Sequence, residues 1–384
     1  MKTMKKVLAM ILALALAMVS LAACGEKPKE SENSGNTTTG GVIKIGATGP
    51  LTGSASSYGI SVNNGAKLAV EELNAAGGIN GLTFSFEMKD DEADPEKVAS
   101  AYDALLDGGM QISLGAVTSG ACLAFGARAA EDNIFFITPS ASNADVIATG
   151  SNAFRICFGD PDQGVLAAEE LTKKYQNIGC IYDTSDEYSA GIYEAFKAKM
   201  AELNVTFETR TFDQDNKTDF SSQVEGLKNC DVIFLPFYYQ EAGLVARACT
   251  GKGLDNIVLF GCDGLDGVAG EIDETVKNEI SYITPFDVSS TEKNVVDFVA
   301  AYKAKYGVEP DQFAADGYDA IYAIANVIKA ADVKDASIKA SDLCEKAKAT
   351  ITSESFKYDG VTGSMTWDES GACEKSAIIV VVGK

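Results

Sequence analysis

Short apolar runs that alternate with helical patterns constrain the fold of this chain more than any other feature. Amphipathic helical patterns occupy 63–78, 94–109, 164–175 and 189–203. The apolar runs that read as strands are 42–48, 84–90, 112–116, 134–139, 178–183, 205–212, 231–237, 256–263, 279–286 and 376–382. Strands that alternate with helices predict βαβ units and mostly parallel sheets. Because ligands of such sheets bind beyond the carboxyl ends of the strands, we expect function in the loops that follow them.

The first 24 residues have the pattern of an export signal. Lys2, Lys5 and Lys6 precede an apolar run at 7–23, and LAAC (21–24) ends this segment. A run of about 17 apolar residues is at the short limit for crossing a bilayer, so a cleaved signal fits better than a membrane anchor. The LAAC box resembles a bacterial lipoprotein signal. This resemblance implies that Cys24 becomes the lipidated first residue and holds the protein on the outer face of the cytoplasmic membrane.

Residues 25–41 are polar and rich in Gly, Ser, Thr and Asn, so we predict a flexible tether. The rest of the chain is long enough for two domains at roughly 150 residues each. The net charge is −23, and removal of the signal with its three lysines and no acid makes it −26. Such a charge excludes a nucleic-acid partner, which needs a basic surface.

The chain contains no histidine, which excludes Ser–His–Asp and Cys–His catalysis and His-containing zinc sites. No nucleophile–base pair is visible, and we expect neither an enzyme nor a cofactor or metal. Beyond Cys24 there are eight cysteines without a CxxC pair, several of them in apolar runs. We predict mostly buried free thiols. Export also permits disulfides, and their pairing cannot be read from sequence.

The loop GATGPLTGSASSYG (46–59) follows the first predicted strand and resembles a phosphate cradle at first sight. It lacks the lysine of a P-loop, and its glycines do not match GxGxxG. Pro50 also removes a backbone donor. The loop therefore predicts close approach of a small ligand, with Tyr58 as its one large ring.

Two further loops place small hydroxyl residues between a strand and a helix start. In the first, Ser119 is a candidate helix N-cap, and the helix start can hold a carboxylate. In the second, Ala141 and Ser142 follow Pro139. Each arrangement also suits a plain helix cap without a ligand. The absence of Arg and Lys argues against phosphate or a dicarboxylate.

Three loops in the second half carry aromatic and acidic side chains. Tyr188 and Tyr238 each follow a strand, and Asp263 stands between glycines in GCDGLDG. A carboxylate in that place can receive an ammonium group, although Asp-Gly is also a common turn pair. The tyrosines equally suit the edge of a core.

Together these motifs identify a family resemblance. The order and spacing of IGATGPLTGSASSYG, NAAGGING, DDEADPEKV, TSG, TPSASN, FRICFGDPDQG, PFYYQEAG, GCDG and TGSMTWDESG are similar to the type I periplasmic binding proteins of branched-chain amino acid ABC transporters. The similarity runs from about residue 42 to 384. It implies two Rossmann-like α/β lobes joined by a three-strand hinge, with crossings near 154–160, 283–288 and 355–360.

The resemblance also implies lobe boundaries and residue roles. Lobe 1 would comprise 42–157 and 287–357, and lobe 2 would comprise 158–286 and 358–384. Ser119, Ala141 and Ser142 would bind the α-carboxylate and part of the ammonium, with Tyr58 as an aromatic wall. Tyr188 and Tyr238 would be second-lobe contacts, and Asp263 would meet the ammonium.

The chain departs from the family pattern at three places. Family members usually carry Glu where Asp263 stands, and Thr is frequent at Ser142. Well-known members also have a disulfide at the positions of Ala93 and Thr118, which this chain lacks.

The expected function is a lipid-anchored substrate-binding protein of an ABC importer. It would close about its hinge on a neutral amino acid, Leu, Ile or Val, and deliver it to permease membrane subunits. A ligand-binding sensory module is the alternative. Binding of a related small amide or carboxylate also stays open.

Overall fold

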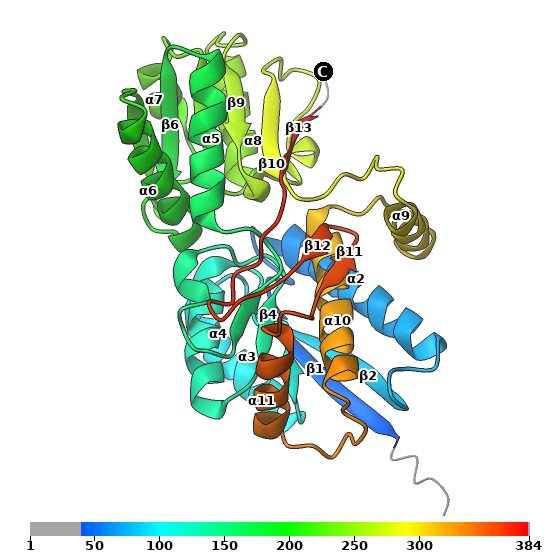
Figure 1. Ribbon diagram of the computed structural model, residues 1–384. Coiled ribbons are helices and arrows are strands. Elements are labelled where there is room, and N and C mark those ends of the chain that lie inside the picture. The colour runs from blue at the N-terminus through cyan, green and yellow to red at the C-terminus, as the bar shows by residue number, and fades with distance from the viewer. Residues whose placement is uncertain (1–39, 383–384) are drawn as a thin grey trace, which may run out of the picture. The chain divides into compact units, whose positions relative to one another are not determined.

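The computed structural model describes residues 40–382, which all belong to one compact unit. The predicted signal and Cys24, and all but the last two residues of the predicted tether, lie outside the described residues. Two sheets organise the described part of the chain, each in its own lobe (Figure 1).

The first lobe is built on a parallel five-stranded sheet in the order β2-β1-β3-β4-β5. Its strands are β1 (Gly41–Gly49), β2 (Leu82–Asp90), β3 (Ile112–Ser113), β4 (Phe136–Thr138) and β5 (Ala153–Arg155). Its helices are α2 (Ser56–Ala75), α3 (Pro95–Asp107), α4 (Ser119–Asp132), α9 (Lys293–Tyr306), α10 (Gln312–Ala330) and α11 (Ala340–Ile351).

The second lobe is built on a six-stranded sheet in the order β13-β10-β9-β8-β6-β7, in which only β13 is antiparallel. Its strands are β6 (Ile178–Asp183), β7 (Glu208–Phe212), β8 (Val232–Leu235), β9 (Val258–Gly261), β10 (Ile280–Thr284) and β13 (Ile378–Val382). Its helices are α5 (Asp160–Lys174), α6 (Glu187–Glu202), α7 (Ser221–Gly226) and α8 (Tyr239–Gly251).

The inner strands of the sheets, such as β8 and β10, are buried on both faces, which explains why they read as continuous apolar runs, whereas the edge strands β7 and β13 are partly exposed. Successive side chains of a strand point to opposite faces. On β8, Ile233 and Leu235 pack with α8, whereas Val232 and Phe234 pack with α5 and α6. The predicted fold class, two α/β lobes with mostly parallel sheets, is confirmed.

Local signals set the helix starts that lead to the site. Asp94 caps α3 by accepting a hydrogen bond from the Glu96 N–H group, and Pro95 is the first helical residue; both residue types are typical of a helix start. All eight cysteines from Cys122 to Cys373 are buried free thiols, which confirms that prediction.

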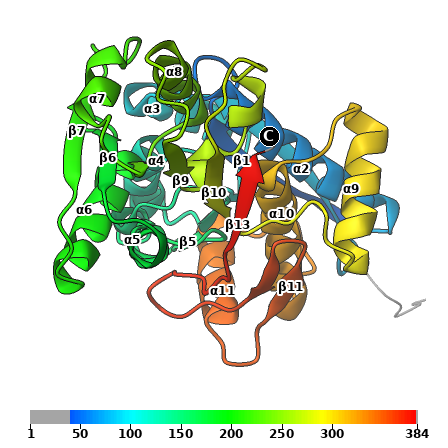
Figure 2. The ribbon, with the colours of Figure 1, turned by 90° about the horizontal axis from the view of Figure 1, so that it is seen from above.

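The chain crosses between the lobes after β5, after β10 and before β13. The third crossing differs from the expectation. A hairpin of β11 (Tyr358–Gly360) and β12 (Gly363–Met365) contacts α10, where Asp319 accepts hydrogen bonds from Val361 N and Thr362 N at 2.9 and 2.8 Å. We therefore propose that the boundary lies between residues 373 and 378 rather than at 358. Figures 1 and 2 show the following segment reaching β10 as β13.

Candidate binding site between the lobes

A small buried cavity of about 20 Å³ lies where loops of the two lobes meet. Its lining combines hydroxyl groups, aromatic rings and one carboxylate: Tyr58, Val117, Thr118, Ser119, Ser140, Tyr188, Tyr238, Asp263, Gly264 and Phe313. Five of the seven residues predicted to bind ligand belong to this lining. The volume is close to that of one water molecule, so a larger ligand can enter only when the walls separate.

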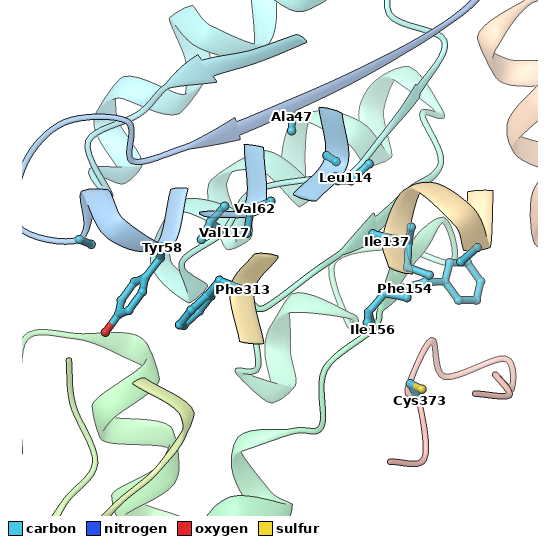
Figure 3. Close-up of a cluster of buried hydrophobic side chains, with 14 of the residues drawn as sticks. Ala47, Tyr58, Val62, Leu114, Val117, Ile137, Phe154, Ile156, Phe313 and Cys373 are labelled. Atoms are coloured by element: carbon cyan, nitrogen blue, oxygen red, sulfur yellow. The ribbon is translucent and has the colours of Figure 1, made fainter. Parts of the chain in front are cut away.

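Tyr58 comes from the first turn of α2 and is almost fully buried, with 2% of its surface exposed. Its ring stacks on Phe313 with centroids 4.1 Å apart (Figure 3). Its hydroxyl group donates a hydrogen bond to Gly264 O and accepts one from Tyr239 N at 3.1 Å. Tyr58 is therefore a polar contact between the lobes as well as an aromatic wall.

Ser119 is the first residue of α4 and not its N-cap, which corrects the expectation from sequence. Thr118 is the N-cap, with an extended backbone and no side-chain cap bond. The Ser119 hydroxyl group instead accepts a hydrogen bond from Asn143 N at 3.2 Å, which ties the two hydroxyl loops together. Because no side chain caps this helix, its first N–H groups can bind an anion such as a carboxylate.

Ala141 and Ser142 are buried beside the cavity but do not line it. The Ala141 N–H group donates to Thr138 Oγ1 at 3.1 Å and is therefore already used. The Ser142 hydroxyl group has no hydrogen-bond partner. Ser140, which the sequence analysis did not single out, lines the cavity and donates to Val117 O at 2.8 Å.

Asp263 begins the 3₁₀ turn η2 (Asp263–Leu265) after β9, and 4% of its surface is exposed. Its Oδ1 atom accepts a hydrogen bond from the Tyr188 hydroxyl group at 2.7 Å. Among the described residues it forms no salt bridge with a Lys or Arg side chain. Burial raises the pKa of Asp263 to about 6, against the lowering effect of the Tyr188 hydrogen bond.

The Tyr238 ring stacks on Tyr188 with centroids 5.2 Å apart. Its hydroxyl group donates to Asp186 Oδ2 at 3.3 Å. Thr118 and Tyr238 also line a second, larger cavity of about 470 Å³, which several carboxylates border. The pKa of Asp186 there is raised to about 6 by burial. This cavity adjoins the small one, because Thr118 and Tyr238 line both.

Phe313 and Gly264 also line the cavity. Gly264 belongs to the GCDGLDG loop, whereas local sequence patterns could not have indicated Phe313. Phe313 is the second residue of α10, some 250 positions after Tyr58. The spacing of apolar residues along α10 does not show which of them face the cavity and which are buried in the core. Thr118 and Ser140 lie in the two hydroxyl loops, so the loop composition was a usable signal for them.

A larger cavity of about 880 Å³ lies beside the first and third crossing segments, lined by Arg155, Trp367 and Lys375 among others. It contains none of the predicted site residues. Within residues 40–382, no group of His, Cys, Asp and Glu side chains is arranged to hold a metal ion. No helix in this range is long and apolar enough to cross a membrane.

The two lobes and the polar site enclosed between them define a solute-binding protein. The model of the periplasmic binding protein family matches residues 42–383, and the chain belongs to this family. The family consists of solute-binding proteins of ABC transporters and not of enzymes.

Related proteins are similar in sequence to most of this chain. The Leu/Ile/Val-binding protein BraC3 of Rhizobium johnstonii is 29% identical over 344 residues, which cover 86% of this chain and 88% of that protein. The leucine-, isoleucine-, valine-, threonine-, and alanine-binding protein of Pseudomonas aeruginosa is 26% identical, with 86% of each chain covered.

This chain is also similar in fold to a solved structure. The branched-chain amino acid transporter substrate binding protein LivJ of Streptococcus pneumoniae, in complex with isoleucine, superposes with a TM-score of 0.78. It is 27% identical, and the match covers 88% of this chain and 95% of that one.

Proposed function

We propose that this protein is the lipid-anchored substrate-binding protein of an ABC importer and that it binds a neutral amino acid, Leu, Ile or Val, by hinge closure. The observation that carries the proposal is the buried Asp263 carboxylate without a cationic partner among the described residues. An unpaired buried charge is costly, so a ligand ammonium group is the partner that the site lacks.

The opposite end of the site suits the ligand carboxylate. The uncapped start of α4 supplies N–H groups and the positive end of the helix dipole. Thr118 Oγ1 and Ser142 Oγ have no hydrogen-bond partner and can satisfy further oxygen or nitrogen atoms. Asp263 on the second lobe can bind the ammonium group of a zwitterion, and the start of α4 on the first lobe can bind its carboxylate.

The walls between these ends are apolar and aromatic. Val117, Phe313 and the rings of Tyr58 and Tyr238 surround the cavity, and no Lys or Arg lines it. Such walls suit an aliphatic side chain. The relatives named for leucine, isoleucine and valine, and the isoleucine complex, support this ligand class.

Hinge closure follows from the size of the cavity. About 20 Å³ does not accommodate an amino acid, so the lobes must open to admit one. Each lobe supplies part of the site, and closure completes it. Micromolar affinity requires about 8 kcal/mol in total.

The role of Asp263 is tested by titration calorimetry with leucine on wild type, Asp263→Asn and Asp263→Glu. Removing one member of a buried charge pair costs about 2–5 kcal/mol, so Asp263→Asn should raise Kd at least about thirtyfold. Asp263→Glu should retain binding because it keeps the charge. The exposed Asp255→Asn is the matched control. Equal binding by wild type and Asp263→Asn contradicts the proposal.

A small aromatic carboxylate is the competing ligand, because solved relatives at 18–20% identity hold benzoates. Such a ligand has no ammonium, so it would bind Asp263→Asn more tightly than wild type. A thermal-shift screen of amino acids, amides and benzoates on both proteins separates the two ligand classes.

The anchor and the transporter context need their own tests. Lipidation predicts that a Cys24→Ser variant is released from the membrane fraction, which fractionation and mass spectrometry of the mature N-terminus can measure. A genome neighbourhood without permease and ATPase genes would favour a sensory module instead.

A further inference from the structure

Two glutamine side chains, one from each lobe, hold the backbone of Asp263. Gln163 on α5 of the second lobe accepts a hydrogen bond from Asp263 N at 3.0 Å. Gln312, the first residue of α10 in the first lobe, donates from Nε2 to Asp263 O at 3.1 Å. Both side chains are 1% exposed. The residue proposed to meet the ligand ammonium is thus clamped from both sides.

Gln312 also joins the site loop to the second crossing segment. Its Oε1 atom accepts a hydrogen bond from the hydroxyl group of Thr284, the last residue of β10, at 2.7 Å. The amide is therefore oriented, with its oxygen toward the crossing segment and its nitrogen toward Asp263. A side chain fixed at both ends has little freedom to move independently of the hinge.

Asp266 completes the contact between the lobes. Its Oδ2 atom accepts a hydrogen bond from Gln312 N at 2.9 Å, and its Oδ1 atom accepts one from the Tyr282 hydroxyl group at 3.0 Å. A carboxylate at a helix N-terminus is stabilised by the free N–H groups and the dipole there. Asp266, from the second lobe, thus binds the start of a first-lobe helix that Asp311 caps from within.

We propose that Gln312 and Asp266 are positioning residues that fix Asp263 toward the ligand only when the lobes close. This inference rests on the proposed function of Asp263 as the ammonium partner. Gln163 lies in the same lobe as Asp263 and holds it in the open and the closed protein alike. Gln312 reaches it from the other lobe, so its contact forms with closure and links ligand affinity to hinge position.

The test compares Gln312→Met with Gln163→Met, which remove the same functional group from opposite sides of Asp263. For Gln312→Met we expect an unchanged Tm without ligand and a leucine Kd raised about five- to twentyfold, the effect of one or two lost buried hydrogen bonds. Gln163→Met should lower the Tm of the unliganded protein, because its contact persists there.

Asp266→Asn provides a second variant that keeps an acceptor oxygen and should raise Kd less than Gln312→Met. We expect the fluorescence of Trp367, the only tryptophan in the chain, to change on closure, because its Nε1 atom donates to Arg155 O next to the first crossing. We expect Gln312→Met to require more leucine for the same fluorescence change.

Three outcomes overturn this inference, and one of them does not depend on the ligand. If Gln312→Met lowers the Tm of the unliganded protein as much as Gln163→Met does, the contact is structural. If wild type and Gln312→Met bind leucine equally, Gln312 does not position Asp263 for ligand binding. If Asp263→Asn binds as wild type while Gln312→Met does not, the role of Asp263 fails, and the inference fails with it.

Discussion

The Tyr58 hydroxyl group donates a hydrogen bond to Gly264 O and accepts one from Tyr239 N, so one side chain of the first lobe is bonded to two loops of the second. Its ring meanwhile packs on Phe313 within its own lobe. The ring of Tyr58 therefore lines the candidate site, and its hydroxyl group bonds the first lobe to the second.

Replacing Tyr58 by Phe should weaken ligand binding while the apolar wall remains. The variant loses both hydrogen bonds to the second lobe, and each is worth about 0.5–1.5 kcal/mol. We expect Kd for leucine to rise about five- to 150-fold by titration calorimetry. The control is Tyr102→Phe, whose hydroxyl group contacts Asp132 inside the first lobe. A similar loss of affinity in both variants would contradict a role in closure.

Replacing Tyr58 by Ala should change ligand selectivity as well as affinity. Removal of the ring takes away wall area that only a large aliphatic side chain contacts, and apolar contact is worth about 25 cal/mol per Å². Binding of leucine, isoleucine and valine should therefore weaken more than binding of glycine or alanine. Equal losses for all five amino acids would show that the ring does not contact the ligand side chain.

Ligand affinity should depend on pH through Asp311 and Asp266. Burial, and then the Asp266 carboxylate, raise the pKa of Asp311 to about 7 in the closed structure, and burial raises the pKa of Asp266. Besides each other, these carboxyl groups face Ser61, Tyr282, the start of α10 and, at longer range, Asp316.

In the open protein we expect these pKa values to return toward about 4. The closed form then binds more protons, so affinity is favoured at low pH and falls as pH rises toward about 7. Asp263 acts in the opposite direction below pH of about 6, because it must be ionised to meet an ammonium. Leucine affinity should therefore peak near pH 6.

Calorimetry at pH 5, 6, 7 and 8 on wild type and Asp311→Asn tests this dependence. The variant should show a smaller fall in affinity above pH 6, because only Asp266 then contributes to it, and should keep the rise below pH 6. The same fall in both proteins would exclude Asp311 as its source.

A buried ion pair stabilises the third crossing between the lobes. Lys375 Nζ lies 3.1 Å from Asp316 Oδ1, with both side chains 1% exposed. Burial lowers the pKa of Lys375, but Asp316, Cys373 and Asp319 together more than offset this effect, so the pKa of Lys375 is raised. Lys375→Met leaves Asp316 unpaired on α10, so we expect a loss of about 3–5 kcal/mol in the free energy of unfolding.

Urea denaturation measures that loss. The control is Lys303→Met, which removes an exposed pair with Glu309 and should leave stability nearly unchanged. The double variant Asp316→Leu with Lys375→Met should recover most of the loss, because no charge is then buried alone. A single variant as stable as wild type would contradict the structural role of the pair.

Sequence patterns predicted ten of the thirteen described strands, the fold class and the loops that line the candidate site; β5, β11 and β12 were not among the predicted strands. Alternating side chains on a strand and the free N–H groups of a helix start are local properties, so apolar runs and the Asp94-Pro95 cap predict them directly. Tyr58, Ser119, Tyr188, Tyr238 and Asp263 followed from their positions after strands together with a family resemblance.

Tertiary structure alone decided which distant groups meet. Asp319 accepts the backbone N–H groups of Val361 and Thr362, and this contact keeps the β11–β12 hairpin on the first lobe. Gln312 contacts Asp263 and Asp266 across the lobes, and Phe313 stacks on Tyr58 within the first lobe, so their roles depend on contacts between segments up to 255 residues apart along the chain. Local periodicity contains no information on such contacts, because the energy of each depends on the partner that folding brings to it.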